Sequence, residues 1–510
     1  LEVYYLANHE RNIYFALLGD FADSSDKDMP GDDEIVNCAL QRIKSLNKKY
    51  SGSGEDIFFF FHRIRKYNPS QGVWMGWERK RGKLIEFNRL LRGDENTGYN
   101  VMSCDISSIP QVKYIITLDA DTQLPRDTAK RLIGTISHVL NRPVLNPDNT
   151  KVIRGYGILQ PRVNIDIVNA RKSLFSRIFA GAGGIDPYTT AVSDIYMDLF
   201  CEGIYTGKGI YDIDVFEQLL DGSIPENAIL SHDLLEGSFA RTGLVTDIEL
   251  VDGFPSKYSS YSARMHRWAR GDWQLLPYLS KTVKNSRGEY VKNTLSVIDK
   301  WKIVDNLRRS VMPASIFILI ILSLSILPGS KRLWFALSAL TISLPVFAGI
   351  ADFILMPINS VNGVASGLRR MICQIGLLLA FLPHRAYLMV DAIIRTLVRL
   401  STKQRLLEWE TAADAEARLK NKLANYIKTM WICPALGIVL PTVWLFFGIP
   451  NLNGILALSA LWFVSPYIAY TISRDIKTKK AVPSDEDIQD IRLIARKTWR
   501  YFEDFVSLKD

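Results

Sequence analysis

Residues 429–473 form a stretch of 45 residues without a charged side chain, and no other feature limits the fold of this 510-residue chain as strongly. Two shorter stretches, residues 310–330 and 333–351, are also uncharged. Because a helix needs roughly 20 apolar residues to cross a bilayer, these stretches predict four membrane spans, the last two joined by the turn-like residues 450–454. The alternative is a buried helical core, but 45 uncharged residues would be exceptional in a soluble domain.

The excess positive charge of the chain lies in the same half as the uncharged stretches. Residues 1–300 have a net charge of −1, whereas residues 301–510 have a net charge of +10. A nucleic-acid enzyme would place its positive surface on the domain that does the chemistry. We therefore expect a lipid bilayer as a partner and no nucleic acid.

The charges that flank the uncharged stretches predict their orientation. Cytoplasmic segments carry an excess of Lys and Arg, and we expect three of them: residues 300–309, 369–428 and 474–480. The short loop with Lys331 and Arg332 argues mildly for the opposite orientation. Residues 371–397 become amphipathic towards their end, which predicts an interfacial helix, and a fifth, tilted span is the alternative.

The first 300 residues alternate short apolar runs with helical patterns, which predicts an α/β domain with a largely parallel sheet. The expected strands are residues 13–18, 57–61, 114–118 and, less cleanly, 152–158. The expected helices are residues 33–50, 83–91 and 126–140. Ligands bind beyond the carboxyl ends of the strands in such sheets, so the polar residues that end each strand are candidate site residues.

Carboxylates follow two of the predicted strands. Asp20 and Asp23 come after the first strand, and Asp119 and Asp121 come directly after the third. An Asp-x-Asp at a strand end can hold a divalent cation, whose charge offsets a diphosphate, because hard cations prefer carboxylate and phosphate oxygens. The same spacing occurs at residues 26–28 and 212–214, but there it does not follow a buried-strand pattern. We therefore predict a metal site at Asp119 and Asp121.

Three later motifs combine glycines, carboxylates and basic-aromatic pairs, at residues 200–211, 231–237 and 264–274. Glycines allow close backbone approach, a carboxylate can act as a base, and Arg beside Trp can pair with phosphate and stack on a sugar. The ordinary alternatives are turn glycines, a helix-capping Asp and a basic-aromatic belt beside the membrane. Asp233 follows an apolar stretch and opens a predicted helix, so it is the candidate base. Glu236 is the nearest rival, and His232 could also serve chemically.

In this order the motifs resemble the signature of inverting, membrane-integrated GT-A glycosyltransferases of the cellulose synthase type. The residues that carry this resemblance are Asp20, Gly82-Lys83, Asp119-Ala120-Asp121, Ser231-His232-Asp233 and Arg267-Trp268. Residues 5–8, 17–21, 207–212 and 407–413 more narrowly resemble the glucosyltransferase region of cyclic β-1,2-glucan synthases. The resemblance runs from residue 1 to about residue 480, although the general signature has Gln where this chain has Arg264.

The resemblance implies a membrane-bound, UDP-glucose-dependent hexosyltransferase of GT-A fold that extends a β-1,2-glucan acceptor. It implies a divalent cation, Mg²⁺ or Mn²⁺, and an inner-membrane location with the catalytic domain facing the cytoplasm. Asp233 takes the position of the catalytic base. The implied donor-binding residues are Asp20, Asp23, Lys83, Asp119, Asp121 and Arg267. The implied acceptor-binding residues are Glu202, Gly203, Tyr205, Lys208, Arg264 and Trp268.

Three regions follow from these patterns: a glycosyltransferase domain at residues 1–300, membrane and interfacial helices at 301–480, and a soluble tail at 481–510. The tail contains one predicted amphipathic helix at residues 485–505. The first strand of the general GT-A fold is not evident before residue 1, and the chain lacks an initiating Met, so we predict truncation at the N-terminus. The cyclisation and phosphorylase-like regions of whole family members are absent from this chain. The alternatives are a related enzyme that makes another β-polymer or a lipid-linked sugar, and a non-enzymatic membrane channel or scaffold.

Overall fold

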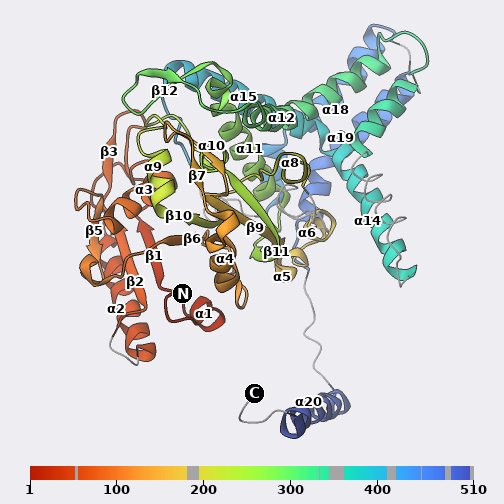
Figure 1. The fold of residues 1–510 in the computed structure, drawn as a ribbon. Coiled ribbons are helices and arrows are strands. Elements are labelled where there is room, and N and C mark those ends of the chain that lie inside the picture. Colours follow the sequence, from red (N-terminus) through yellow and green to blue (C-terminus); the bar gives the residue numbers. More distant parts are fainter. Residues whose placement is uncertain are drawn as a thin grey trace. The chain divides into compact units, whose positions relative to one another are not determined.

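The computed structural model describes residues 1–51, 55–180, 194–331, 333–343, 361–409, 421–449, 451–476 and 484–505, with the backbone alone for 361–368. By internal contacts the chain forms two compact units, Leu1–Arg474 and Asp475–Asp510. The first unit contains an α/β region and a region of apolar helices (Figure 1). The combination of an α/β domain with a helical region is therefore confirmed.

One sheet of the α/β region has the strand order β1-β2-β5. Its strands are β1 (Phe15–Asp20), β2 (Phe58–Arg63) and β5 (Tyr99–Met102). Every residue of β2 is buried, as expected for a central strand covered on both faces. Helix α2 (Asp32–Tyr50) packs on this sheet, where Asn47 accepts from and donates to the backbone of Phe58.

A second sheet has the order β11-β9-β10-β6. Its strands are β6 (Tyr114–Thr117), β9 (Ile158–Ile165), β10 (Gly209–Asp212) and β11 (Thr242–Asp252). The prediction of a largely parallel sheet is wrong. Pairs β1–β2 and β11–β9 are parallel, but β5 runs antiparallel to β2, and β10 runs antiparallel to both β9 and β6. Strand direction depends on long connections, which the alternation of strand and helix patterns does not determine.

Three predicted elements shift or divide. The run at residues 152–158 is broken, because Gly155 adopts a φ of 68° and a Cβ there would lie 2.0 Å from the Arg142 carbonyl oxygen. The short strand β8 (Val152–Arg154) therefore ends before β9 begins. Helix α3 (Arg79–Leu91) begins four residues before residue 83, while α4 (Thr128–Ser137) is shorter than the helix predicted at residues 126–140.

Short elements complete the α/β region. The remaining strands are β3 (Lys66–Asn68), β4 (Val73–Met75), β7 (Val144–Leu145), β12 (Thr282–Lys284) and β13 (Tyr290–Lys292). The remaining helices are α1 (Glu2–Ala7), α5 (Ile167–Ala170), α6 (Leu174–Phe179), α8 (Ile195–Phe200), α9 (Ile213–Leu220), α10 (Asp233–Phe239) and α11 (Tyr258–Gln274).

The helical region contains α12 (Val297–Leu324), α14 (Val361–Ala380), α15 (Leu382–Thr402), α17 (Leu423–Thr429), α18 (Ile432–Phe446) and α19 (Leu452–Ile472). In the described residues, α12 and α19 are long and apolar enough to cross a membrane. Up to four spans result if the bent pairs α14–α15 and α17–α18, each bent by 60°, count as one span apiece. The predicted span at 333–351 is described only for a short helix, Leu333–Ser343.

The two regions of the first unit meet along α11, which packs against α12 and α15. A buried hydrogen bond of 2.9 Å joins the Tyr258 hydroxyl to Nδ1 of His384 at this contact. The second unit contains α20 (Asp485–Phe505), so the helix predicted for the tail is confirmed.

Candidate active site

A fully paired group of charges lies where β1 and β2 end. Arg63 donates to Asp20 through Nε at 2.7 Å and Nη2 at 3.0 Å, and to Glu86 through Nη1 at 2.7 Å. Lys83 is the next cation, 3.1 Å from Asp20. Burial alone would raise the pKa of Asp20, but Arg63 and Lys83 outweigh it and lower the pKa below the ordinary range. Asp20 is therefore a charged carboxylate at the sheet edge, as its place in the sequence predicts.

Asp119, which follows β6, lies between two lysines. Nζ of Lys80 is 2.5 Å from one carboxylate oxygen, and Nζ of Lys208 is 3.3 Å from the other. Lys208 also pairs with Asp252, the last residue of β11. Burial raises the pKa of Asp119, but the two lysines more than offset this and lower it overall. Two ammonium groups beside one strand end form a place suited to phosphate oxygens.

Asp121 has different surroundings from Asp119. Its side chain is 48% exposed, and the Arg264 guanidinium lies 3.9 Å from its carboxylate. The backbone there is held by Thr122, whose hydroxyl donates to Asp252 at 2.6 Å. Since Asp119 is occupied by lysines, Asp121 is the member of the Asp-x-Asp whose oxygens have room for a further ligand. Carboxylate oxygens of this kind fit a hard divalent cation.

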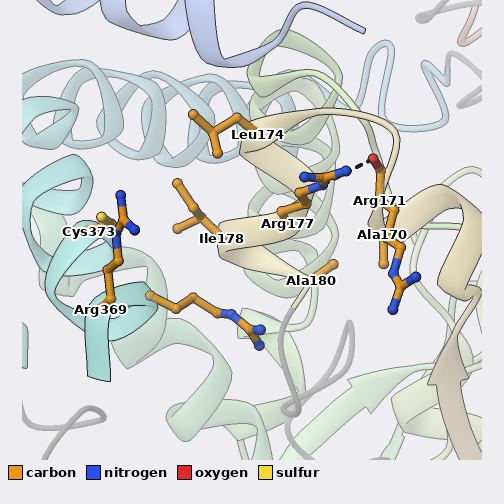
Figure 2. A pocket seen from close by; sticks show the side chains of 9 residues that line it. Ala170, Arg171, Leu174, Arg177, Ile178, Ala180, Arg369 and Cys373 are labelled. Carbon is orange, nitrogen blue, oxygen red and sulfur yellow. Dashed lines mark hydrogen bonds between the residues drawn. The ribbon is translucent and has the colours of Figure 1, made fainter. Parts of the chain in front are cut away.

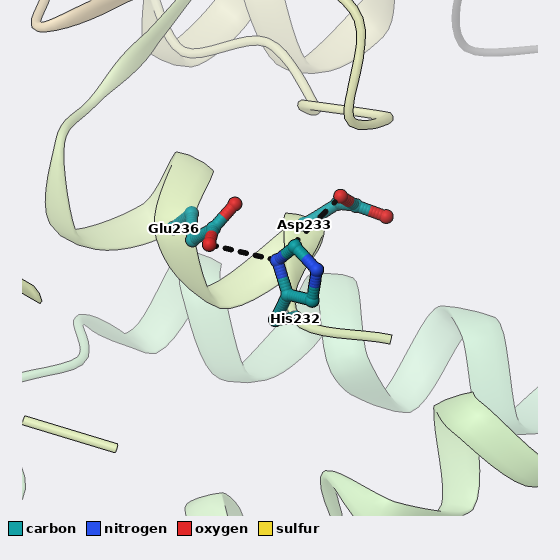
Figure 3. A group of neighbouring side chains, drawn as sticks. All are labelled: His232, Asp233 and Glu236. Atoms are coloured by element: carbon teal, nitrogen blue, oxygen red, sulfur yellow. Dashed lines mark ion pairs between the residues drawn. The ribbon is translucent and has the colours of Figure 1, made fainter. Parts of the chain in front are cut away.

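Asp233 is the first residue of α10, and its neighbours His232 and Glu236 share one end of that helix (Figure 3). Nδ1 of His232 lies 2.7 Å from Glu236 and 3.7 Å from Asp233. The two carboxylates point to opposite sides of the imidazole ring in Figure 3. His232 and Glu236 are buried, whereas the Asp233 side chain remains 27% exposed. Asp233 is therefore the member of this cluster that can meet a ligand.

The ionisation of this cluster follows from its burial. Burial raises the pKa of Asp233 above the ordinary range of an aspartate, although the charges of His232 and Lys80 oppose the shift. Burial alone would lower the pKa of His232, but Glu236 and Asp233 outweigh it and raise the pKa. A carboxylate with a raised pKa is a better proton acceptor, which is a property of catalytic bases.

Gly207 connects the Asp233 cluster with the lysines around Asp119. It has a φ of 83°, and its carbonyl oxygen accepts from Nζ of Lys80 at 2.9 Å. A Cβ at Gly207 would lie 2.5 Å from Oδ1 of Asp233 and 3.1 Å from Nζ of Lys80. Glycine is therefore required here by conformation and by space. Lys80, a lysine suited to bind phosphate, and Asp233, the candidate base, therefore both lie beside Gly207.

The residues predicted to bind the acceptor lie in separate places. Glu202 lies between Arg241 at 3.5 Å and Lys302 of α12 at 3.6 Å, and Lys302 also donates to the Gly203 carbonyl oxygen at 3.2 Å. Tyr205 is buried, with its hydroxyl 3.0 Å from Oγ1 of Thr117. Glu202 and Gly203 therefore share a contact with Lys302, whereas Tyr205 contacts the last residue of β6.

Helix α11 supplies the basic-aromatic residues. The guanidinium of Arg267 lies over the ring of Trp409, 5.1 Å from its centre. Trp268 is 36% exposed and has Arg264 over its ring at 6.0 Å.

Asp23, also predicted to bind the donor, pairs with Arg79 at 2.6 Å.

The segment that carries Trp409 is fixed to the site by its backbone. The carbonyl oxygens of Leu406, Leu407 and Glu408 accept from Gln274, Arg79 and Arg270 at 2.8, 2.5 and 3.1 Å. The rest of the predicted motif at residues 407–413 lies outside the described residues from residue 410 onwards. A connection of the helical region is thus joined to α3 and α11.

Sequence reasoning missed three residues of this site: Arg63, Lys80 and Asp252. The sequence predicts Lys83 as the lysine that binds the donor. In the structure Lys80, one turn earlier, contacts Asp119, while Lys83 contacts Asp20. The basic run at residues 79–83 signalled a cation but not which one. Asp252 ends β11, a strand that was not predicted, and the rule that selected Asp119 applies to it only once that strand is known.

In the described residues, a group of three possible metal ligands within 4.8 Å of one another is His232, Asp233 and Glu236. The short ion pair between His232 and Glu236 already uses two of these side chains for each other. The predicted pair Asp119 and Asp121 offers one engaged and one half-exposed carboxylate. The donor set of hard oxygens at Asp121 fits a divalent cation better than the engaged imidazole cluster does.

The fold and site define a class: an α/β domain whose strand ends gather lysines and carboxylates suited to a phosphorylated ligand, joined to apolar helices. No protein-family model matches the chain. The chain is 42% identical to the cyclic β-(1,2)-glucan synthase NdvB of Rhizobium meliloti (strain 1021) over 520 aligned residues, which cover 99% of this chain and 18% of that protein. The resemblance to cyclic β-(1,2)-glucan synthases is thereby confirmed for a segment that spans about a fifth of that relative.

Proposed function

We propose that this chain is an inverting glucosyltransferase of GT-A fold that moves glucose from UDP-glucose onto a growing β-1,2-glucan at a membrane. The observation that carries the proposal is the placement of Asp233. Its partly exposed carboxylate lies beside the position that a Cβ would take at Gly207, as does Nζ of Lys80, which pairs with Asp119. A single displacement needs two such groups close together: a base for the proton of the acceptor and cations for the leaving diphosphate.

The proposed reaction is balanced by these residues. An acceptor hydroxyl attacks the anomeric carbon, the bond from that carbon to the phosphate oxygen breaks, and UDP leaves with the electron pair. Asp233 accepts the hydroxyl proton, a step worth about 10² to 10⁴ in rate. Lys80 and Lys208 lie where they can stabilise the leaving diphosphate.

The remaining assignments follow the same division. Asp20 and Asp23 contact the nucleoside side of the donor, and Lys83, predicted for the diphosphate, supports Asp20. Arg267 contacts the pyrophosphate of the donor, and Trp268 contacts the acceptor. A divalent cation, Mg²⁺ or Mn²⁺, held by Asp121 beside Asp119 would neutralise charge on the leaving diphosphate. Support for the location of this cation is the exposure of the Asp121 carboxylate.

The proposed acceptor side includes Glu202, Gly203, Tyr205 and Arg264, whereas Lys208, predicted for the acceptor, lies beside Asp119 and is proposed for the diphosphate. Glu202 pairs with Lys302 of α12, a candidate span. This pairing brings the acceptor side of the domain to the start of an apolar helix. A polymer made here would therefore grow next to the helices.

We also propose that the α/β region, residues 369–428 and the tail from residue 474 face the cytoplasm of an inner membrane. The support is the excess of basic residues at residues 300–309, 369–428 and 474–480, which flank the apolar stretches. A cysteine placed at Asn453, the start of α19, should be labelled from outside intact cells by an impermeant reagent. Labelling that requires broken cells would reverse the orientation.

The activity is tested by incubating membranes that contain the protein with labelled UDP-sugars, one at a time, and determining the linkage of the product. We expect incorporation from UDP-glucose and β-1,2 linkages. Asp233→Asn should lose this incorporation. Its matched control, Asp247→Asn, removes a 73% exposed carboxylate paired with Arg131 and should keep it. Another linkage would assign the enzyme to a different β-polymer, and a lack of incorporation from every sugar would favour a channel or scaffold.

A further inference from the structure

An open cavity of about 930 Å³ lies between α6 and the described part of α14 (Figure 2). It is distant in sequence from the strand-end carboxylates, and none of the residues discussed for the active site lines it. Its principal lining side chains are Arg171, Leu174, Arg177, Ile178, Arg369 and Arg370.

The lining combines positive charge with apolar surface. Of the lining residues that the structure describes, four are arginines and none is acidic. Arg177 and Arg171 are held near each other, since Nε of Arg177 donates to the Arg171 carbonyl oxygen at 3.4 Å. Four guanidinium groups around one space repel each other unless an anion lies among them, and their planar forks match phosphate oxygens.

The place of the cavity relative to the apolar helices narrows the choice of anion. Arg369 and Arg370 lie within α14 and directly precede its uncharged residues 371–380. Arginines at the point where the apolar part of a helix begins lie at the level of lipid head groups. Basic pockets beside membrane helices are known to suit anionic head groups.

The apolar part of the lining favours a phospholipid over a soluble phosphate as the ligand. Leu174 is 47% exposed, and Ile178 lies on the same cavity wall, one turn along α6. A phospholipid offers a phosphate to the arginines and an acyl chain to this wall, whereas inorganic phosphate offers only charge. We propose that the cavity binds the phosphate head group of an anionic phospholipid, with the start of its acyl chains against Leu174 and Ile178.

Cys373, an exposed residue of the cavity lining, gives a test on the unaltered protein. In neutral detergent, phosphatidylglycerol should slow the reaction of Cys373 with a maleimide about tenfold, as expected for charge-assisted hydrogen bonds that keep a ligand in place. The exposed Cys38 and Cys201 serve as internal controls and should react at unchanged rates. Phosphatidylcholine and inorganic phosphate should not protect Cys373.

A variant with Arg171, Arg177, Arg369 and Arg370 all changed to Gln should lose the protection. A variant with Arg492, Arg496, Lys497 and Arg500 of α20 changed to Gln removes the same charge elsewhere and should keep it. The double variant Arg171→Gln/Arg177→Gln, at two exposed positions, provides the same test if the fourfold variant has a lowered melting temperature.

Protection that persists in the double variant would overturn the proposal, and so would equal rates with and without phosphatidylglycerol. Protection by inorganic phosphate as strong as that by phosphatidylglycerol would assign the cavity to a soluble anion instead. Because the measurement follows the modification of a thiol, its result is independent of whether glucose transfer occurs.

Discussion

Two groups of charges in the α/β region differ in how completely they are paired. Arg63 is buried and donates to Asp20, Glu86 and two backbone carbonyl oxygens. Asp233, in contrast, keeps 27% of its side chain exposed and has a raised pKa because of burial. A saturated group holds the fold, while an incompletely satisfied one retains the capacity to bind and to accept a proton.

The largest effect on stability is expected at the saturated group. Arg63→Met leaves the carboxylates of Asp20 and Glu86 buried without their main partner, and we expect the free energy of unfolding to fall by about 3–5 kcal/mol. The matched change Arg131→Met breaks an exposed pair with Asp247 and should cost about 1 kcal/mol or less. Thermal melting of both variants in detergent measures the difference, and equal melting temperatures would remove the distinction between the two groups.

Asp121→Asn should reduce turnover by about a hundredfold or more, because a cation beside the leaving group supplies several kcal/mol. The half-exposed carboxylate has few contacts to lose, so melting should be unchanged. The measurement is the rate of glucan formation with and without excess chelator. Full activity of the variant, or of the unaltered protein in chelator, would contradict the metal assignment.

Lys80→Met and Lys83→Met compare a lysine of each group. Lys80 is 2.5 Å from Asp119 and lies with Asp233 on one side of Gly207, whereas Lys83 is 3.1 Å from the already paired Asp20. We expect kcat/KM for UDP-glucose to fall about tenfold more for Lys80→Met, the range of a charged hydrogen bond. A larger loss for Lys83→Met would return the diphosphate contact to the residue that the sequence alone suggested.

These lysines also show how far sequence reasoning extends. The strand-end rule found Asp20 and Asp119, because position along one strand is a local property. The pairing of Lys80 with Asp119 joins α3 to the loop after β6, and that of Thr122 with Asp252 spans 130 residues. Such contacts depend on how elements pack, which the periodicity of a single segment does not contain. For the same reason the antiparallel direction of β10 was not predicted.

The smallest expected effect concerns the dependence of stability on pH. The pKa of His232 is raised in the folded protein, so its pairing with Glu236 contributes stability that is fully present below the pKa of an unfolded histidine, about 6.5. That contribution is lost as the pH rises through the raised value. Glu236→Gln should flatten this part of the curve of melting temperature against pH. An unchanged curve would show that the ion pair does not form.

The central claim is that Asp233 accepts the proton of the acceptor hydroxyl, and Asp233→Asn tests it most directly. The measurement is the initial rate of glucan elongation at saturating UDP-glucose, taken together with donor binding and melting temperature. We predict a loss of about 10² to 10⁴ in rate with donor binding and melting temperature unchanged. Elongation at a near wild-type rate would contradict the account and move the base to Glu236 or to another residue.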